Sequence, residues 1–375
     1  MNITTSFRRS HDMAGKKILM TVDAVGGVWR YAMDLAAGLR AAGMNVVFVG
    51  FGPEPTAAQR QEAAALGCVE WCAAPLDWML DEEAGLDAVP DLVSRLADLH
   101  RVDLLHLNLP SQAAGLSVPQ PVVTVSHSCV VSWFAAVRET GIPRSWDWQA
   151  RRNALGFAAA DAVVAPSNSH AALIETCYGP IRGLRIVPNA SRLTERQTTA
   201  EPFVLAAGRW WDEGKNGRVL DESAPQLDWP LVMAGAARSP RGEGFDIRHA
   251  DHRGELGYAE TIGLMSRAGI FVSPSRYEPF GLAVLEAARN GLPLVLADIP
   301  TYRELWDGAA RFFPPQDANA LAEVVNGLIA APERRATLGQ AARLRSAEYR
   351  PERQVEAMLR LYGDLCATTA PAGGR

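Results

Sequence analysis

The sequence predicts an α/β protein with two doubly wound domains, each a parallel sheet covered by helices. The chain has 375 residues, which at about 150 residues per domain is enough for two. Short β-branched runs alternate with helical patterns, as in βαβ units. A polar stretch at residues 194–202 interrupts this alternation, which then restarts. We therefore expect a linker there, between two folded domains.

The first half of the chain predicts a sheet with interleaved helices. We expect strands at residues 17–22, 45–51, 104–107, 122–126, 162–166 and 185–188. Between them, the spacing of apolar residues predicts helices at 28–39, 89–99 and 145–160. Gly43 follows the first of these helices and ends it. Residues 16–193 then form the first domain, after a mobile tail over residues 1–15.

The second half repeats the pattern. Strands are predicted at 203–207, 231–234, 270–273 and 294–297, and helices at 215–220, 259–268, 281–289 and 318–329. Residues 332–365 read as helical with a break near Pro351. We expect a second domain over 203–349 and a separate C-terminal segment over 350–375.

Composition excludes several classes of protein. The formal charge of −5, from 37 basic and 42 acidic residues, argues against a dedicated nucleic-acid binder. The five cysteines are scattered and form no CxxC pair, so neither a disulfide framework nor a zinc site is indicated. The uncharged stretch 104–137 is broken by prolines and polar residues, and the first apolar run, 18–22, is too short for a signal peptide. We expect a cytoplasmic protein with reduced thiols and no transmembrane helix.

Two glutamates form the strongest chemical signal. Glu278 lies in a loop after a predicted strand, and Glu286 lies on the helix that follows Gly281. Two such carboxylates can accept hydrogen bonds from the hydroxyls of one ligand, and the N–H groups at the helix start favour an anion. A solvated acidic helix face is the alternative.

Two cations follow the first strand of the second half. That strand leads to Gly208 and Arg209, and Lys215 begins the next helix. A guanidinium fork and an ammonium point charge suit two adjacent phosphates, although both could simply be surface cations. Lysine otherwise occurs only at positions 16 and 17. Because arginine serves nearly everywhere else, the lysine at 215 favours a specific role.

Two further segments lie at predicted strand ends. Gly26 and Gly27 form a glycine turn without the GxGxxG dinucleotide fingerprint, so it either approaches a ligand or is a tight βα turn. His127 follows the strand at 122–126, where it either contacts a ligand or has a structural role.

Taken in order, these segments resemble the retaining GT-B glycosyltransferases of family 4, the group 1 glycosyltransferases. The matching pieces cover nearly the whole chain: Gly26-Gly27, His127, Ala165-Pro-Ser167, Val187-Pro-Asn189, Gly208-Arg209 with Lys215-Asn216, Arg253-Gly254, and the Ser273 to Glu286 segment with its two glutamates. The second-half match is the more specific. Trp210-Trp211, Arg30 and Ala288-Arg289-Asn290 depart from the pattern, and we expect these to affect neighbouring specificity.

The resemblance implies two Rossmann-like domains with a central cleft and C-terminal helices that cross back to the first domain. It also implies that a sugar moves from a nucleotide diphosphate sugar without a divalent metal or other cofactor. In the family pattern His127, Arg209, Lys215 and Glu278 act at the reacting sugar and phosphates. The donor is bound by Gly26, Gly27, Arg253, Gly254, Phe280, Gly281, Leu282 and Glu286.

The function implied is retaining transfer of a hexose, from a UDP- or GDP-linked donor, to a hydroxyl of a saccharide or lipid-linked saccharide. This fits the synthesis of bacterial cell-surface polysaccharides. A catalytically silent nucleotide-sugar-binding protein and a sugar-nucleotide epimerase are the alternatives. The residues discriminate neither the donor base and sugar nor the oligomeric state.

An aromatic and basic segment gives the acceptor-side prediction. Trp133, Arg138, Arg144 and Trp146 lie close together in the sequence, with Trp148 and Arg152 just after them. They form either an acceptor surface, a weak anchor at the inner face of a membrane, or an amphipathic helix that packs its tryptophans into the core.

Overall fold

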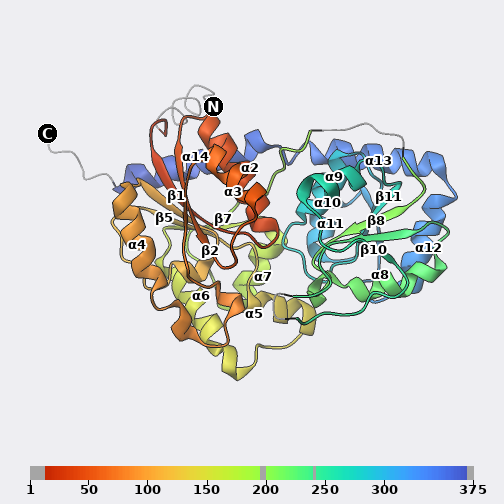
Figure 1. The fold of residues 1–375 in the computed structure, drawn as a ribbon, viewed down its shortest axis with the longest axis horizontal. Coiled ribbons are helices and arrows are strands. Elements are labelled where there is room, and N and C mark those ends of the chain that lie inside the picture. The colour runs from red at the N-terminus through yellow and green to blue at the C-terminus, as the bar shows by residue number, and fades with distance from the viewer. Residues whose placement is uncertain (1–12, 195–199, 240–241, 370–375) are drawn as a thin grey trace. The chain divides into compact units, whose positions relative to one another are not determined.

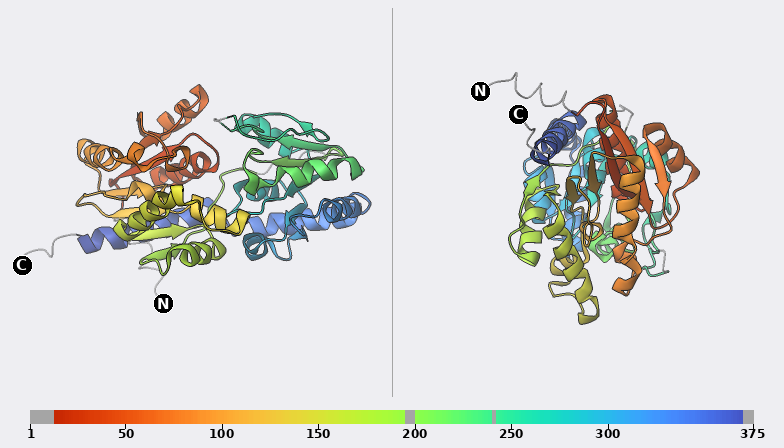
Figure 2. Two further views of the ribbon diagram at one scale, coloured as in Figure 1. Left: turned by 90° about the horizontal axis from the view of Figure 1, so that it is seen from below. Right: turned by 90° about the vertical axis from the view of Figure 1, so that its left-hand side faces the viewer.

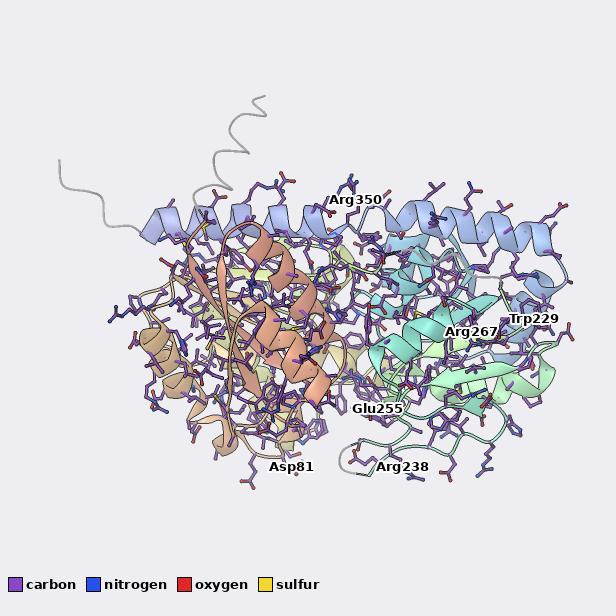
Figure 3. All side chains as sticks on the ribbon, turned by 45° about the horizontal axis from the view of Figure 1, so that its top comes forward. Asp81, Trp229, Arg238, Glu255, Arg267 and Arg350 are labelled. Atoms are coloured by element: carbon purple, nitrogen blue, oxygen red, sulfur yellow. The ribbon has the colours of Figure 1, made fainter. Side chains whose placement is uncertain are left out.

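The computed structural model describes residues 13–194, 200–239 and 242–369, which form two compact units (Figure 1). Unit 1 comprises the chain up to Ala190 together with the segment from Pro351, and unit 2 comprises Ser191–Arg350. Arg350, labelled in Figure 3, is thus the last residue of unit 2 before the chain rejoins unit 1. Each unit holds one parallel sheet, and each therefore has an α/β fold.

Unit 1 is built on a seven-stranded sheet of order β3-β2-β1-β4-β5-β6-β7. Its strands are β1 (Lys17–Asp23), β2 (Asn45–Phe51), β3 (Cys68–Trp71), β4 (Leu104–Leu107), β5 (Val122–Val125), β6 (Ala162–Ala165) and β7 (Leu184–Ile186). Every pair is parallel. The central strands are buried along most of their length, which explains their near-continuous apolar sequences.

The helices of unit 1 cover this sheet. They are α2 (Gly27–Ala41), α3 (Ala57–Leu66), α4 (Val89–His100), α5 (Val130–Trp133), α6 (Asp147–Ala159), α7 (Asn168–Tyr178) and the C-terminal α14 (Pro351–Thr369). Helix α14 packs against α2, and both views of Figure 2 show its blue ribbon beside the elements of unit 1. Gly38 allows this approach, because a Cβ there would lie 2.2 Å from Cγ2 of Val355.

Unit 2 contains a six-stranded parallel sheet of order β10-β9-β8-β11-β12-β13. The strands are β8 (Val204–Ala207), β9 (Leu231–Ala234), β10 (Asp251–His252), β11 (Ile270–Ser273), β12 (Leu294–Ala297) and β13 (Ala310–Phe313). The helices are α8 (Gly217–Ser223), α9 (Tyr258–Met265), α10 (Leu282–Arg289), α11 (Pro300–Trp306), α12 (Ala318–Ile329) and α13 (Pro332–Ser346).

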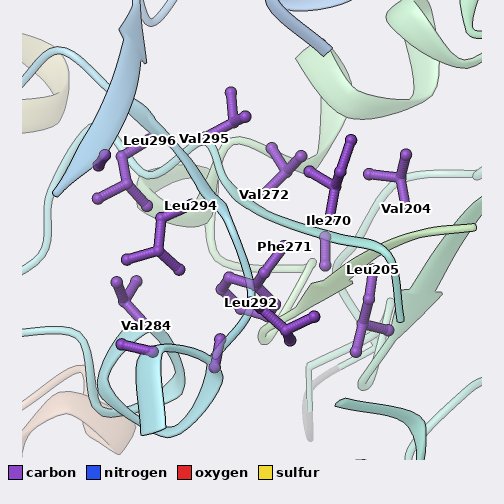
Figure 4. Close-up of a cluster of buried hydrophobic side chains, with 14 of the residues drawn as sticks. Val204, Leu205, Ile270, Phe271, Val272, Val284, Leu292, Leu294, Val295 and Leu296 are labelled. Carbon is purple, nitrogen blue, oxygen red and sulfur yellow. The ribbon is translucent and has the colours of Figure 1, made fainter. Parts of the chain in front are cut away.

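The core of unit 2 forms where its central strands meet α10. Leu205, Phe271 and Leu294 come from three neighbouring strands and pack with Val284 of α10 (Figure 4). All four side chains are buried. This core fixes the strand ends and the start of α10, and the candidate site is built on both.

The strands and helices expected from the sequence are present, within a few residues at their ends, and α14 confirms that the C-terminal segment returns to the first unit. The prediction of a tail reaching Gly15 is wrong at its end. Met13 is buried, and the N–H of Gly15 donates to the carbonyl of Gly43. Residues 1–12, and 195–199 of the expected linker, lie outside the described residues.

All five cysteines have free thiols. None of the helices in the described ranges combines the length and apolar character needed to cross a bilayer.

Candidate functional site

The switch point of the unit 2 sheet determines where a site can form. The chain runs from β8 outward to β9 and β10, then returns to β11 on the other side of β8. The loops that leave β8 and β11 therefore diverge at the carboxyl edge of the sheet, which is where doubly wound sheets bind ligands. Those loops carry Arg209 and Lys215, and Glu278.

Hydrogen bonds join these two loops. The backbone N–H of Arg276 donates to the carbonyl of Gly214 at 2.9 Å. Asn216 adopts the left-handed region, with φ of 57°, and its Nδ2 donates to the carbonyl of Pro274 at 2.9 Å. The loop after β8 is thus fixed against the loop after β11.

Lys215 and Glu278 meet across this junction. Nζ of Lys215 donates to Oε2 of Glu278 at 2.6 Å. The side chains are only 19% and 15% exposed, so the pair is partly shielded from water, which strengthens the attraction between its charges. The sequence predicted these two residues at one site, and the structure places them in direct contact.

Arg209 belongs to the same loop as Lys215 but remains more accessible. Its side chain is 37% exposed, and Nη2 lies 3.9 Å from Oδ2 of Asp212. Its guanidinium carbon lies 5.4 Å from the centre of the Trp211 ring. Of the two tryptophans that depart from the family pattern, Trp211 therefore flanks the arginine. Trp210 is buried, and its Nε1 donates to the carbonyl of Ala234.

Glu286 lies on the first turns of α10 and is buried, at 6% exposure. Its Oε1 accepts a hydrogen bond from the hydroxyl of Tyr258 at 3.0 Å. The helix brings Glu286 to the sheet while the Glu278 loop precedes it, as the spacing predicted. Nothing in the sequence pattern singles out Tyr258, which begins α9.

The turn at Arg253 and Gly254 follows the short edge strand β10. The N–H of Gly235 donates to the carbonyl of Gly254 at 2.7 Å, and the N–H of Gly208 donates to the carbonyl of Ala234. The turn is thereby connected through the end of β9 to the residue before Arg209. The Arg253 side chain is exposed and pairs with Asp251 at 2.6 Å.

At the start of α10 only the backbone is available for a ligand at Phe280. Its ring is buried and stacks edge-on against Tyr349, with 5.4 Å between ring centres. Gly281 follows with φ of 89°, and Leu282 is half-buried. The predicted donor contact at Phe280 is therefore restricted to its peptide groups.

In unit 1 the corresponding switch point lies between β1 and β4. Strand β1 leads to Gly26 and Gly27, which are exposed and begin α2. Gly26 has φ of 92° and ψ of −143°, a conformation that side chains with a Cβ rarely adopt. Arg30, one turn later, pairs with Asp34 and Glu62 at 2.8 Å each.

His127 follows β5 at the same edge of the unit 1 sheet. Its Nε2 lies 2.9 Å from Oδ1 of Asn108, and its ring meets Tyr31 edge-on, with 4.4 Å between ring centres. Loss of solvation lowers the pKa of His127 to about 3, with smaller contributions in the same direction from the nearby His106 and His170. The imidazole is therefore neutral over the physiological range.

Sequence reasoning missed Asn108 and His106. His106 lies in β4 and Asn108 directly follows its last residue, and a spacing of two residues places two side chains on the same face of an extended chain. They lie beside His127, so a polar pair with this spacing at the end of a buried strand is the signal that was available.

The acceptor-side segment divides into two parts. Phe134 links Trp133 and Trp146 edge-on, with 5.2 and 5.8 Å between ring centres. The guanidinium carbon of Arg138 lies 5.8 Å from the Trp133 ring, and Arg144 is exposed. Further along, Trp148 and Arg152 are buried, so packing into the core accounts for that half of the segment.

One group of three side chains in the described residues has the spacing of metal ligands, namely Cys68, Glu70 and His100, whose ligand atoms lie within 4.8 Å of one another. It lies on the edge strand β3 and the end of α4. In the sheet, strands β2 and β1 lie between β3 and β4, so β3 is not next to the strands that lead to Asn108 and His127. A search for CxxC pairs does not detect this arrangement.

Family models match both units. The model described as "Glycosyltransferase Family 4" matches residues 25–194, and the one described as "Glycosyl transferases group 1" matches residues 202–345. A glycogen synthase of Mycobacterium tuberculosis is 38% identical over 116 residues, which are 30% of this chain and 26% of the relative. A GDP-mannose:cellobiosyl-diphosphopolyprenol alpha-mannosyltransferase of Xanthomonas oryzae is 26% identical over 59% of this chain and 60% of its own length. The matches thus span less than two thirds of these relatives.

Solved structures show the same fold. Sucrose-phosphate synthase from Thermosynechococcus elongatus aligns with a TM-score of 0.77 at 20% identity, covering 94% of this chain and 100% of that chain. HepE of Anabaena, solved in complex with UDP and glucose, aligns with a TM-score of 0.73 at 16% identity, covering 93% and 100%. With its two parallel α/β sheets of GT-B type and a family model on each unit, the chain belongs to the group 1 glycosyltransferases of family 4.

Proposed function

We propose that this protein is a retaining glycosyltransferase that moves a hexose from a UDP- or GDP-linked donor to a hydroxyl of a saccharide or lipid-linked saccharide acceptor. The observation that carries the proposal is the contact between Lys215 and Glu278 at the switch point of the unit 2 sheet. A fixed cation and a fixed hydroxyl acceptor lie side by side there, and a sugar diphosphate requires both. The relatives of known function support nucleotide-sugar chemistry.

The donor's diphosphate is bound by the two cations of the β8 loop. Arg209 is accessible enough to form paired hydrogen bonds with phosphate oxygens, and Lys215 supplies a point charge beside them. The peptide N–H groups at the start of α10 add the positive end of a helix dipole. These fixed charges take the role that a divalent metal has in other transferases.

The two glutamates bind the hydroxyls on either side of the diphosphate. Glu278 accepts from the transferred sugar, and Glu286 accepts from the nucleotide ribose in place of the Tyr258 hydroxyl. In unit 1 we assign His127 to a hydroxyl of the sugar. Its low pKa means that it binds as a neutral imidazole.

Transfer breaks the bond between the anomeric carbon and the phosphate oxygen and forms a bond from that carbon to the acceptor oxygen. Negative charge grows on the departing diphosphate, where Arg209 and Lys215 stabilise it. The acceptor hydroxyl attacks on the face that the diphosphate leaves, and its proton passes to a phosphate oxygen. Because the bond to the acceptor forms on the same face of the sugar from which the diphosphate departs, the anomeric configuration is retained.

Thermal-shift screening of the full chain against UDP-, GDP-, ADP- and TDP-linked sugars tests the donor. A ligand that binds only the native state stabilises it in proportion to RT ln(1 + [L]/Kd), so the true donor raises Tm most. Product NMR with the selected donor and a panel of saccharide acceptors then gives the linkage. A donor that binds without nucleotide release indicates a silent binding protein, and sugar interconversion without acceptor indicates an epimerase; either outcome contradicts the proposal.

Arg209→Ala tests the site itself. Loss of one well-aimed phosphate contact is expected to lower kcat by about 10²–10³-fold. Arg267→Ala is the matched control, because Arg267, labelled in Figure 3, is another arginine of unit 2 and forms an exposed ion pair with Glu201. Exposed pairs of this kind contribute little to stability, so the control should transfer sugar at the wild-type rate. Equal rates for Arg209→Ala and Arg267→Ala would refute the assignment of Arg209.

A further inference from the structure

Three strand ends of unit 1 place a hydrogen-bond network around His127. Asn108, after β4, donates from Nδ2 to the carbonyl of Thr21 in β1 at 2.5 Å, and its own N–H donates to Oγ1 of Thr21 at 2.8 Å. The first contact determines the orientation of the amide, because a carbonyl oxygen only accepts hydrogen bonds. Oδ1 of Asn108 must therefore point the other way, and there it meets His127.

The orientation of Asn108 determines where His127 carries its proton. An amide oxygen is an acceptor only, so Nε2 of His127, at 2.9 Å from Oδ1, must be the protonated nitrogen. In a neutral imidazole the other nitrogen then has a lone pair. Nδ1 of His127 makes no hydrogen bond with the described part of the chain, and so its lone pair is available to a ligand.

The same oxygen also orders a second histidine. Nε2 of His106 lies 3.3 Å from Oδ1 of Asn108 and 3.4 Å from the hydroxyl of Tyr31, which can donate or accept. Because two lone pairs on Nε2 and Oδ1 would repel each other, Nε2 donates toward the amide oxygen. Nδ1 of His106 is then an acceptor, and the hydroxyl of Tyr362 donates to it at 2.7 Å. Tyr362 lies on α14 and is fully buried, so the C-terminal helix completes the network.

We propose that Asn108 is a positioning residue that holds His127 in the Nε2–H tautomer, so that Nδ1 accepts a hydrogen bond from a hydroxyl of the sugar. Tyr362 holds the neighbouring His106, and not His127, in its Nε2–H tautomer. The role toward the sugar rests on the proposed function, whereas the tautomer itself does not. Because the unprotonated Nδ1 only accepts hydrogen bonds, His127 would favour sugars with a hydroxyl group that points toward Nδ1.

Long-range ¹H–¹⁵N correlation of the full chain, with ¹⁵N-labelled histidine, measures the tautomer directly. We expect a protonated Nε2 and an unprotonated Nδ1 for His127 at pH 7.5, with the signals assigned by their absence from His127→Gln. A protonated Nδ1 in the wild type would overturn the proposal, whatever the activity of the enzyme.

Two variants test the cause. Asn108→Leu removes the acceptor at similar volume, so His127 should lose its single tautomer and show averaged nitrogen shifts. Tyr362→Phe removes only a hydroxyl, so the His106 signals should change while His127 keeps Nε2–H. Tyr178→Phe is the matched control, because Tyr178 is another tyrosine of unit 1 whose hydroxyl contacts Cys129. An unchanged His127 pattern in Asn108→Leu, or unchanged His106 signals in Tyr362→Phe, would contradict the network.

Kinetic measurements test whether Nδ1 of His127 contributes to sugar transfer, which the NMR measurement of the tautomer does not test. Loss of one oriented hydrogen bond should lower kcat/KM of Asn108→Leu by about 2- to 10-fold. Adding His127→Ala to that variant should cost less than His127→Ala costs alone, because both changes affect one interaction. Additive losses would overturn the role of Nδ1 even if the tautomer is as expected. A wild-type protein that transfers no sugar would instead contradict the proposed function, and the NMR result would still decide the tautomer.

Discussion

At the scale of single residues, substitutions at Lys215 can separate the effect of side-chain shape from the effect of charge. Its ammonium fits between the β8 loop and Glu278 at 2.6 Å, in a partly shielded position. A guanidinium carries the same charge on a larger planar group that is oriented for paired contacts. The chain uses arginine for most of its other cations, and we expect the compact ammonium to be the reason for a lysine at this position.

Substitution at Lys215 tests this distinction. Lys215→Met removes the charge at similar length and should lower kcat by about 10²–10³-fold, as for loss of a donor to a developing oxyanion. Lys215→Arg keeps the charge and should still fall well below the wild type, because the larger head cannot occupy the space beside Glu278. Steady-state kinetics with the identified donor give both values. Wild-type activity in Lys215→Arg would show that charge alone is needed.

The residues around His127 show what a sequence can reveal. The position of His127 at the end of a buried strand was predictable, because parallel strands end at one edge of a sheet. The pair of His106 and Asn108 marks the end of β4 as polar, but no spacing in the sequence links Asn108 to a residue 19 positions later. Contacts between loops that are distant in sequence depend on strand order, which a single sequence does not determine.

At the scale of elements, the end of β9 is the tightest point of the unit 2 site. Gly235 has φ of +119°, and a Cβ there would lie 1.9 Å from the carbonyl oxygen of Gly208. Its N–H also bonds to Gly254. A side chain at 235 would push the strand end against the segment that leads to Arg209.

Gly235→Ala is therefore expected to destabilise unit 2 by more than the ~1–3 kcal/mol of a strained backbone conformation, because a backbone clash is added to it. Gly263→Ala is the control, since Gly263 lies inside α9 and a methyl group added there would meet nothing within 4 Å. Removing a helical glycine should stabilise by roughly 0.5–1 kcal/mol. Urea unfolding of both variants gives the comparison, and equal midpoints would contradict the argument.

The strands that the sequence did not predict share a physical cause. Strands β3, β10 and β13 lie at sheet edges, are short and are partly or fully exposed, so they lack the apolar runs that identify central strands. The central strands were predictable because their sequences must fill a buried layer, whereas helices α3, α7 and α11 were not predicted. The edge strand β7 was predicted as well, so pattern finds every central strand but only some of the edge strands and helices.

At the scale of the whole molecule, the two units should respond differently to acid. Unit 1 contains His106, His127 and His170, whose pKa values burial lowers to about 4, 3 and 4. In unit 2, burial raises the pKa of Asp221, but the N–H groups of residues 248–250 outweigh it and lower the pKa overall. Both the three histidines of unit 1 and Asp221 of unit 2 resist protonation. They titrate in different pH ranges, because histidine and aspartate have different ordinary pKa values.

The number of protons bound by the folded and unfolded forms determines whether the stability of unit 1 rises or falls with pH. An unfolded histidine takes up a proton below about pH 6.5, whereas these three stay neutral in the native state until about pH 4 or lower. The unfolded form of unit 1 therefore binds more protons in that window, and its stability falls as the pH drops, by up to about 1.4 kcal/mol per pH unit for each histidine. Burial raises the pKa of Asp77 in unit 1, which opposes this trend, but one carboxyl acts against three histidines. Asp221 begins to lose its contribution only near and below pH 4, its ordinary range when unfolded.

We expect unit 1 to lose stability first between pH 6.5 and 4.5, while unit 2 holds. Hydrogen exchange read by mass spectrometry assigns each peptide to its unit, and the exchange rates of core amides in β4 and β5 report unit 1 while those in β11 and β12 report unit 2. His106→Gln removes one of the three titrating groups and should make the decline of unit 1 shallower, with the slope in unit 2 unchanged. Earlier acid opening of β11 and β12 would contradict this account, because the histidines with lowered pKa values named above all lie in unit 1.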